Sequence, residues 1–266
     1  MIAGLPLYDL PELEEATDAL WRALARALGD EGVSRAPAHL TRGRETHELW
    51  SDPALAFSQI CGYPLQRSFH DRLQVVATPR YTAPGCEGAT YRSLLCAPVA
   101  GRRRGLADLA GARCAVNEIS SHSGMNALRR EVAPFARRGR FFAEVVATGS
   151  HRRSLELLAA GGADVAAIDC VTFALLRRVA PELTGAVCVL GMTAAAPAPP
   201  YVISRGGPLR AGPALAALRR VLADPILEPA RRALLLDGVE VLPPGAYLHF
   251  QAVEDEAARQ GYPALA

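Results

Sequence analysis

The sequence predicts an α/β fold with mixed, mostly parallel sheets and helices on both sheet faces. Short apolar runs of strand length alternate with helical patterns along nearly the whole chain. Small polar residues stand where the apolar runs end, which is typical of loops that lead from a strand into a helix. With 266 residues, half of them hydrophobic, the chain is long enough for a sizeable core.

The first part of the chain reads as a strand over residues 2–8 followed by a helix. Pro11 stands in the expected first helical turn, and the helix ends near Gly29. Its apolar stripe is formed by Leu13, Ala16, Leu20, Leu24 and Leu28. Further strands are expected over residues 54–63, 73–81, 90–100 and 113–118.

In the middle of the chain, serines mark two helix starts. Ser123 is a plausible N-cap for a helix to about Phe135, and Ser150 for one that ends at Gly161-Gly162. A strand over 164–170, a helix over 171–179 and a strand over 186–192 follow. A proline-rich connector and a strand lead to helices over 214–222, 227–235 and 246–260.

Composition excludes several classes of protein. The net charge of +2 does not favour nucleic acid or an anionic membrane as a partner, and no apolar run has transmembrane length. Every basic residue apart from histidine is arginine, so no Schiff-base or Walker-type lysine is available. The six cysteines lack metal-ligand spacing and are expected as free thiols, with a Cys86–Cys96 bridge as the alternative.

Two extended connectors, at 96–99 and 194–200, bracket a block of the size of a small α/β unit. This layout predicts two lobes joined by a hinge of two segments, with a ligand cleft at the hinge. The first lobe is expected to comprise residues 1–97 and to be completed by 197–266, and the second to comprise residues 98–196.

Polar residues at strand ends predict an anion site. A helix start offers free N–H groups, and Ser120, Ser121 and Ser123 before and beside Gly124 exceed what capping requires. His151 follows the second capping serine, and Asp169 ends a buried strand, where it either pairs with an arginine or faces a cleft. The remaining candidates are His122, equally placed to bind or to lie on the rim, with Asn117, Gln59 and Cys61.

The motifs DLAGARCAVNE, SSHSGMNAL, FFAEVVATGSH and GGADVAAIDC resemble the phosphonate/phosphate substrate-binding proteins of ABC transporters. LAFSQICGYPL and YRSLL resemble the same family more weakly. The resemblance implies the type 2 periplasmic-binding-protein fold, two lobes that close on a phosphonate, phosphate or phosphate ester, and an ABC permease as partner. It also implies that Ser121, Ser123, Gly124, His151 and Asp169 contact the ligand, with first-lobe contacts from 59–62, including Gly62, and from Tyr8.

Two other functions remain open at this point. The first is an enzyme on the same scaffold, similar to menaquinone-pathway enzymes or thiamine-pyrimidine synthases, although no catalytic motif stands out. The second is a transferrin-like metal site. The expectation is a binding protein that needs neither cofactor nor metal. The first residues show no signal-peptide pattern, so the protein is expected in the cytoplasm, or in the periplasm if a leader was removed.

Overall fold

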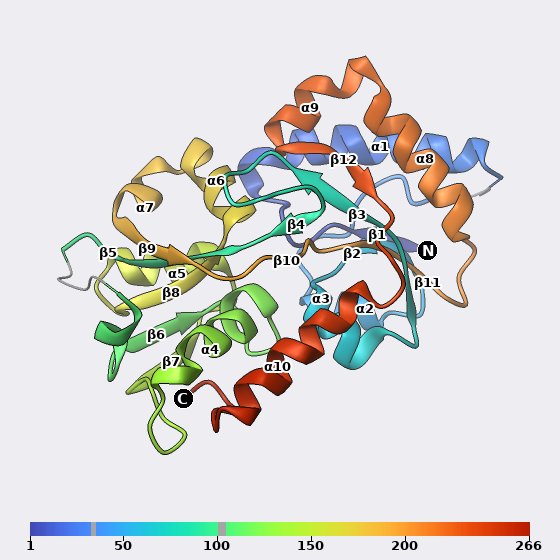
Figure 1. The fold of residues 1–266 in the computed structure, drawn as a ribbon. Helices are drawn as coiled ribbons and strands as arrows, with labels where there is room; N and C mark the ends of the chain where they lie inside the picture. The colour runs from blue at the N-terminus through green and yellow to red at the C-terminus, as the bar shows by residue number, and fades with distance from the viewer. Residues whose placement is uncertain (33–35, 101–104) are drawn as a thin grey trace. The chain divides into compact units, whose positions relative to one another are not determined.

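A computed structural model describes residues 1–32, 36–100 and 105–266, and in it the chain forms two compact units. Unit 1 comprises residues 1–82, 87–89 and 197–246. Unit 2 comprises residues 83–86, 90–196 and 247–266. Each unit has its own five-stranded sheet and its own helices (Figure 1).

The sheet of unit 1 has the strand order β1-β2-β11-β3-β12. Its strands are β1 (Ile2–Gly4), β2 (Leu55–Gln59), β11 (Tyr201–Ser204), β3 (Leu73–Tyr81) and β12 (Leu236–Glu240). β1 and β2 are parallel, β11 is antiparallel to both of its neighbours, and β12 is antiparallel to β3. All five residues of β2 are buried, as the continuous apolar run predicts for a central strand.

Three helices pack together on unit 1. α1 (Glu14–Asp30) follows a 3₁₀ turn at Pro11–Leu13, and it contacts α8 (Ala211–Ala223) and α9 (Glu228–Ala233). α1 buries Leu20, Trp21 and Leu24 on one face, as the apolar stripe predicts. The shorter elements of this unit are α2 (Thr46–Ser51), α3 (Gly62–Pro64), a π-helical turn (Leu65–Phe69) and a 3₁₀ turn (Pro225–Leu227).

The sheet of unit 2 has the order β7-β6-β8-β5-β9. Its strands are β7 (Glu144–Ala147), β6 (Arg113–Val116), β8 (Val165–Asp169), β5 (Ser93–Pro98) and β9 (Val187–Met192). β6 is parallel to both β7 and β8, whereas β5 is antiparallel to β8 and β9. The carboxyl ends of β7, β6 and β8 therefore lie at one edge of this sheet.

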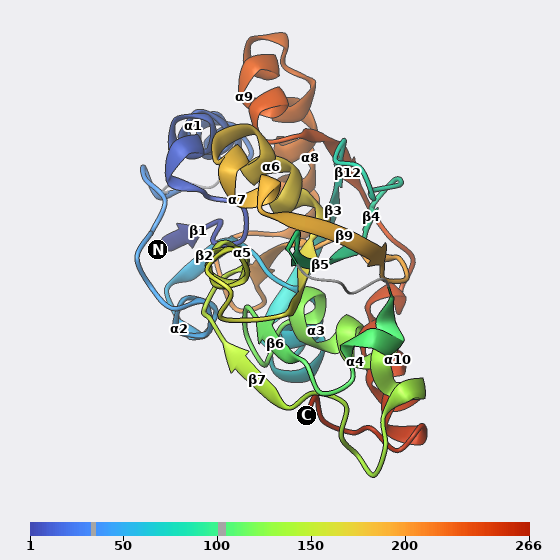
Figure 2. The same cartoon turned by 90° about the vertical axis from the view of Figure 1, so that its left-hand side faces the viewer.

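The helices of unit 2 include a π-helical turn (His122–Asn126) that continues into α4 (Ala127–Val132). The others are α5 (His151–Ala159), α6 (Cys170–Val179), α7 (Pro181–Gly185) and α10 (His249–Arg259), with 3₁₀ turns at Leu106–Leu109, Ala133–Phe135 and Ala246–Leu248. α4 and α10 lie side by side in both ribbon views (Figures 1 and 2). The pair β4 (Thr90–Tyr91) and β10 (Ala196–Pro197) forms a separate two-stranded sheet.

The two units of the structure differ from the two lobes that the sequence predicts, in which residues 1–97 and 197–266 form the first lobe and residues 98–196 the second. β5 belongs to unit 2 because it is hydrogen-bonded between β8 and β9. α10 also belongs to unit 2, where Arg130 Nε donates to Glu256 Oε2 at 2.7 Å and Asn126 Nδ2 donates to the carbonyl of Phe250 at 3.2 Å. The expectation of mostly parallel sheets is also too simple, because β5, β11 and β12 run against their neighbours.

The six cysteines are free thiols. Cys86 lies beside Cys170, with 3.5 Å between the two sulfur atoms, whereas Cys96 is fully buried in β5. The alternative of a Cys86–Cys96 bridge is therefore wrong.

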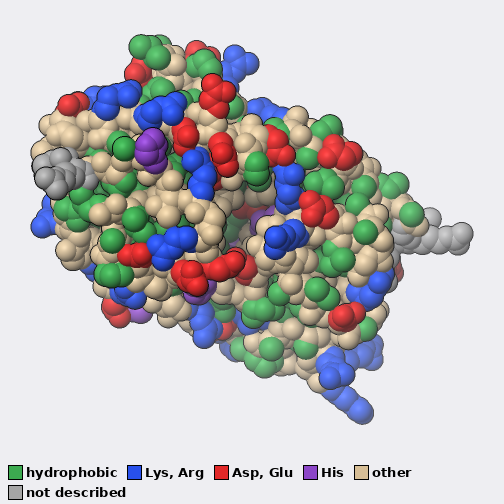
Figure 3. Space-filling view, turned by 180° about the vertical axis from the view of Figure 1, so that it is seen from behind, with side chains coloured by type: hydrophobic (Ala, Val, Ile, Leu, Met, Phe, Trp, Pro, Cys, Tyr) green, Lys and Arg blue, Asp and Glu red, His purple; other side chains and the backbone are tan. Residues whose placement is uncertain are grey.

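The exterior is mixed in charge. Figure 3 shows arginines and acidic side chains interspersed over the face that it presents, without a large area of one sign. This distribution agrees with the net charge of +2. No helix within the described residues is long and apolar enough to cross a membrane.

Candidate functional site

Three loops of unit 2 begin at the carboxyl ends of its parallel strands. The loop after β6 carries Asn117 to Ser121, the loop after β7 carries Thr148 to Ser150, and β8 ends on Asp169 itself. Each of these loops leads into a helix start, where backbone N–H groups have no partner within the helix. In open α/β sheets this edge is where ligands bind, because helix dipoles and polar loops converge there.

Three side chains at this edge form a continuous hydrogen-bonded group, which we call the serine–histidine cluster (Ser121, Ser123 and His151). The Oγ of Ser121 accepts a hydrogen bond from the Gly124 amide at 3.2 Å and lies 3.3 Å from the Oγ of Ser123. The Oγ of Ser123 lies 2.8 Å from the Nε2 of His151. The cluster therefore joins the starts of two helices through side-chain hydroxyls that are nearly fully buried.

Ser121 is the N-cap of the first of these helices, whereas the sequence pattern predicts Ser123 in that role. Ser121 has extended backbone angles, and its hydroxyl caps the Gly124 amide, as an N-cap residue does. Ser123 lies inside the first turn, so its hydroxyl is available to His151. The prediction that Ser150 caps the next helix is confirmed, since its Oγ accepts from the Arg153 amide at 3.1 Å.

His151 is held in its neutral form. Burial lowers its pKa from the ordinary value of 6.5 to about 4, and its place in the first turn of α5 disfavours a proton charge in the same direction. Its Nδ1 is buried and has no hydrogen-bond partner among the described residues. A neutral imidazole has one donor and one acceptor nitrogen, so this ring can give or take one further hydrogen bond.

Asn117 lies against the same helix start. A Cβ atom placed on Gly124 would come within 1.9 Å of the Asn117 Oδ1, so only glycine leaves room for this amide. The Asn117 Oδ1 is buried without a hydrogen-bond partner in the described part of the chain. An unpartnered buried carbonyl oxygen is costly, so the site offers an acceptor beside the serine–histidine cluster.

Asp169 caps α6. Its Oδ1 accepts hydrogen bonds from the amides of Val171 at 2.7 Å and Thr172 at 3.0 Å, and the residue is 4% exposed. The carboxylate thus has a structural role at the same sheet edge as the cluster, where it is a fixed negative charge.

Two other candidates have different surroundings. The ring of His122 packs against Phe250 of α10, with 4.6 Å between ring centroids, and burial lowers its pKa to about 3. Its Nδ1 lies 3.3 Å from the Asn126 Nδ2. The structure therefore explains His122 as a core residue beneath α10. The hydroxyl of Ser120 donates to Glu118 Oε2 at 3.4 Å.

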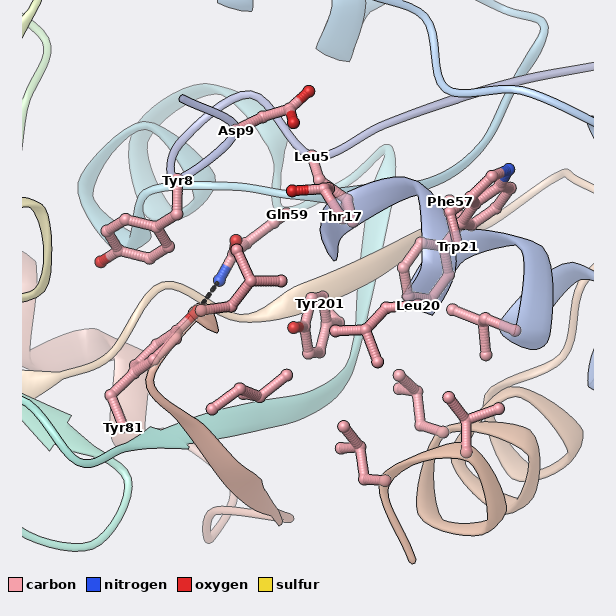
Figure 4. A pocket seen from close by; sticks show the side chains of 16 residues that line it. Leu5, Tyr8, Asp9, Thr17, Leu20, Trp21, Phe57, Gln59, Tyr81 and Tyr201 are labelled. Carbon is pink, nitrogen blue, oxygen red and sulfur yellow. Dashed lines mark hydrogen bonds between the residues drawn. The ribbon is translucent and has the colours of Figure 1, made fainter. Parts of the chain in front are cut away.

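The first-lobe candidates meet in unit 1. Tyr8 packs edge-on against Tyr81 with 5.1 Å between ring centroids, and Gln59 Nε2 donates to the Tyr81 hydroxyl at 2.9 Å. Both contacts lie at one end of a cavity in this unit, where Figure 4 labels the three side chains. Cys61 and Gly62 follow β2 at the start of α3 and are buried outside the lining of that cavity.

Sequence reasoning missed two features of these regions. Tyr201 lines the cavity of unit 1, but the strand that carries it is remote in sequence from the other residues there. The contact between Asn117 and Gly124 was missed as well, because only the backbone path after β6 shows how close the two residues lie. The SSHSG pattern marks the helix start, yet it carries no information on which side chain lies over it.

The comparison with protein families decides the assignment. A sequence profile described as "ABC transporter, phosphonate, periplasmic substrate-binding protein" matches residues 2–238. The chain belongs to this family. A search of curated proteins gave no match.

Solved structures agree with this family assignment at the level of the fold. A binding protein component of an ABC phosphonate transporter from Pseudomonas aeruginosa superposes with a TM-score of 0.76 and 13% identity, covering 98% of this chain and 87% of that one. PhnD1 from Prochlorococcus marinus, in complex with methylphosphonate, gives 0.75 and 11%, with 97% and 98% covered. XAC2383 from Xanthomonas citri, bound to ATP, gives 0.73 and 15%, with 98% of each chain covered. The two-lobed periplasmic-binding-protein fold is thereby shown for this chain.

We predict that the free energy of unfolding decreases as the pH falls from about 6.5 to about 4. His151 and His122 have folded-state pKa values of about 4 and about 3, below the ordinary 6.5, so the unfolded chain takes up protons first. Their stabilising contribution is complete above pH 6.5 and is lost below it. Urea unfolding at several pH values measures this dependence, and His151→Gln should reduce it. An NMR titration that gives His151 a pKa near 6.5 in the folded protein would contradict the prediction.

Gly124→Ala should lower the unfolding free energy by about 1–3 kcal/mol, because the new methyl group displaces the Asn117 side chain. Gly212→Ala in the first turn of α8 is the matched control, since no atom lies within 4 Å of the place that its new methyl group would take. The control should leave stability unchanged or raise it by about 0.5–1 kcal/mol. Equal effects of the two substitutions in urea unfolding would show that Asn117 does not occupy this place.

Proposed function

We propose that this solute-binding protein takes a small phosphorus oxyanion, a phosphonate, phosphate or phosphate ester, at the serine–histidine cluster of unit 2. The observation that carries the proposal is the hydrogen bond between the Ser123 hydroxyl and His151, which brings two helix starts to one place. Helix N-termini with serine hydroxyls bind anions through directed N–H and O–H donors and through the helix dipole. PhnD1, a protein of similar fold, was solved in complex with methylphosphonate.

The donors at the site are neutral, which suits a ligand that must be released. Ser121 and Ser123 can each turn a hydroxyl proton toward a ligand oxygen, since within the described part of the chain their hydroxyls are linked to one another, to the Gly124 amide and to His151. The neutral His151 ring can support either orientation of the Ser123 proton. Binding then depends on hydrogen bonds and on the helix dipoles.

The fixed carboxylate of Asp169 supplies discrimination between anions. Its Oδ1 accepts hydrogen bonds from two amides at the start of α6, which fix the carboxylate in place. A carboxylate near an anion site accepts a hydrogen bond from a monoprotonated phosphonate or from a ligand amine, but repels a fully ionised sulfate. We therefore expect phosphorus oxyanions to bind more tightly than sulfate.

Family membership assigns the chain to the substrate-binding components of ABC transporters. We propose that an ABC permease receives the ligand from this protein. The compartment in which this happens stays a prediction from the sequence.

Ser123→Ala should weaken the binding of methylphosphonate about 10- to 100-fold, because a hydrogen bond to a charged group contributes about 1.5–3 kcal/mol. Isothermal titration calorimetry measures the dissociation constants for methylphosphonate, phosphate and sulfate. Ser120→Ala is the matched control, since its hydroxyl is directed to Glu118, and its affinity should stay within about twofold of the wild type.

Three results would contradict these proposals. A Ser123→Ala protein that unfolds at lower temperature but binds methylphosphonate normally would assign this serine a structural role only. Binding of sulfate as tight as binding of methylphosphonate would contradict the role of Asp169. Failure of the wild type to bind any phosphorus oxyanion would refute the proposed function.

A further inference from the structure

Two cysteines of unit 2 lie close enough to react with each other. The sulfur atoms of Cys86 and Cys170 are 3.5 Å apart, although 84 positions separate the two residues in the chain. Both residues belong to unit 2, so their distance does not depend on how the two units are placed. Neither cysteine has a part in the proposed binding of a phosphorus oxyanion.

A tight turn brings Cys86 to this position. The amide of Cys86 donates to the carbonyl of Ala83 at 3.0 Å, and Pro84 and Gly85 stand between them. Gly85 has a φ of +100°, so the segment has the residues and the left-handed glycine of a type II turn. A Cβ atom on Gly85 would come within 3.2 Å of the Cys170 Cβ and 3.3 Å of its Sγ. The turn therefore packs directly against Cys170.

The sheet and the start of α6 hold Cys170 in place. It is the first residue of α6, its amide donates to the carbonyl of Arg92 at 3.0 Å, and it is 1% exposed. The residue before it, Asp169, pairs with Ser93 in the register of β8 and β5. A disulfide bond is about 2.05 Å long, so the two sulfur atoms must approach further. This approach is expected from the turn, since Cys170 is fixed on both sides.

The two thiols differ in their access to solvent and in their acidity. Cys86 is half-buried, so a dissolved reagent can reach its sulfur atom. The hydrogen bond with Cys86, burial and the charge of Asp169 raise the pKa of the Cys170 thiol. Because the thiolate is the form that attacks a disulfide, Cys86 reacts first and Cys170 second.

We propose that Cys86 and Cys170 form a reversible redox pair, which is oxidised to a disulfide by exchange with a small-molecule disulfide such as oxidised glutathione. In the first step the Cys86 thiolate attacks one sulfur of the reagent, and the glutathione thiolate that leaves takes up the proton that Cys86 released. In the second step the Cys170 sulfur attacks the Cys86 sulfur of this mixed disulfide. The Cys170 proton passes to the second glutathione, which leaves as a thiol. The two cysteines lose two electrons, and the reagent gains them.

The bond joins the turn to the first residue of α6. In the chain, this turn stands between residues 1–82 and 87–89, which both belong to unit 1. The disulfide thus secures the short segment by which the chain first enters unit 2. The cross-link also closes a long loop, which restricts the unfolded chain and stabilises the folded protein. A thiol reagent can reverse the reaction, since the Cys86 sulfur is within reach of solvent.

Peptide mapping of the full chain tests the proposal. The protein is incubated with oxidised glutathione, its remaining thiols are blocked with iodoacetamide, and it is digested with trypsin. The chain has no lysine, so Cys86 lies in the peptide 81–92 and Cys170 in the peptide 154–177, each with no other cysteine. Mass spectrometry should find these two peptides linked, with two of the six thiols lost. Dithiothreitol should restore both thiols.

Thermal unfolding supplies a second readout. Oxidation should raise the unfolding midpoint of the wild type by about 5–10 °C, because a disulfide that closes a long loop restricts the unfolded chain. Cys86→Ser should abolish both the link and this rise. Cys188→Ser is the matched control, since Cys188 is half-buried like Cys86, and this variant should behave like the wild type.

Three results overturn the proposal. The first is a protein that keeps all six thiols in oxidised glutathione. The second is glutathione that stays attached to Cys86, or a link between other cysteines, because Cys170 then does not react with Cys86. The third is a link between Cys86 and Cys170 that leaves the unfolding midpoint unchanged or that dithiothreitol does not reverse. None of these results bears on the binding of phosphorus oxyanions, which is measured separately.

Discussion

The hydrogen bond between the Ser123 hydroxyl and the Nε2 of His151, 2.8 Å long, ties together two helix starts that arise from different strands of unit 2. It exists because β6 and β7 are parallel neighbours, so the loops that follow them emerge at one edge of the sheet. The loop after β6 brings Ser121 and Ser123 there, and the loop after β7 brings His151. If the two loops emerged at different edges, Ser121 would only cap its helix and Ser123 would have no contact with His151. Because they emerge at one edge, hydroxyl donors and helix dipoles converge on one point.

The residues around this hydrogen bond keep the pair of Ser123 and His151 uncharged and in place. Burial keeps His151 uncharged, and Asn117 lies over the helix start only because Gly124 has no side chain. Asp169 is anchored by two backbone amides, which keep a negative charge at the same sheet edge. The family assignment agrees with this chemistry, since the matching family is that of periplasmic substrate-binding proteins for phosphonate.

Much of this arrangement could be predicted from the sequence because it is local. The apolar runs predicted the bounds of β3 and β8 to within one residue, and Ser150 predicted where α5 begins. What could not be predicted depends on contacts between distant segments. The ring of His122 packs beneath α10, more than a hundred residues later in the chain, and the assignment of α10 to unit 2 follows from the same contacts. The role of Asp169 was also ambiguous from the sequence, since a carboxylate before a helix can either cap the helix or contact a ligand. The three-dimensional structure shows that it accepts from the amides of Val171 and Thr172.

A crystal structure of the protein grown with methylphosphonate tests the central claim most directly. We expect phosphonate oxygens at hydrogen-bond distance, about 2.7–3.2 Å, from the Ser123 hydroxyl and from backbone amides of the helix start at His122. We also expect an intact contact between Ser123 and His151 beside the ligand. A phosphonate bound at any other place, with the serine–histidine cluster untouched, would contradict the account.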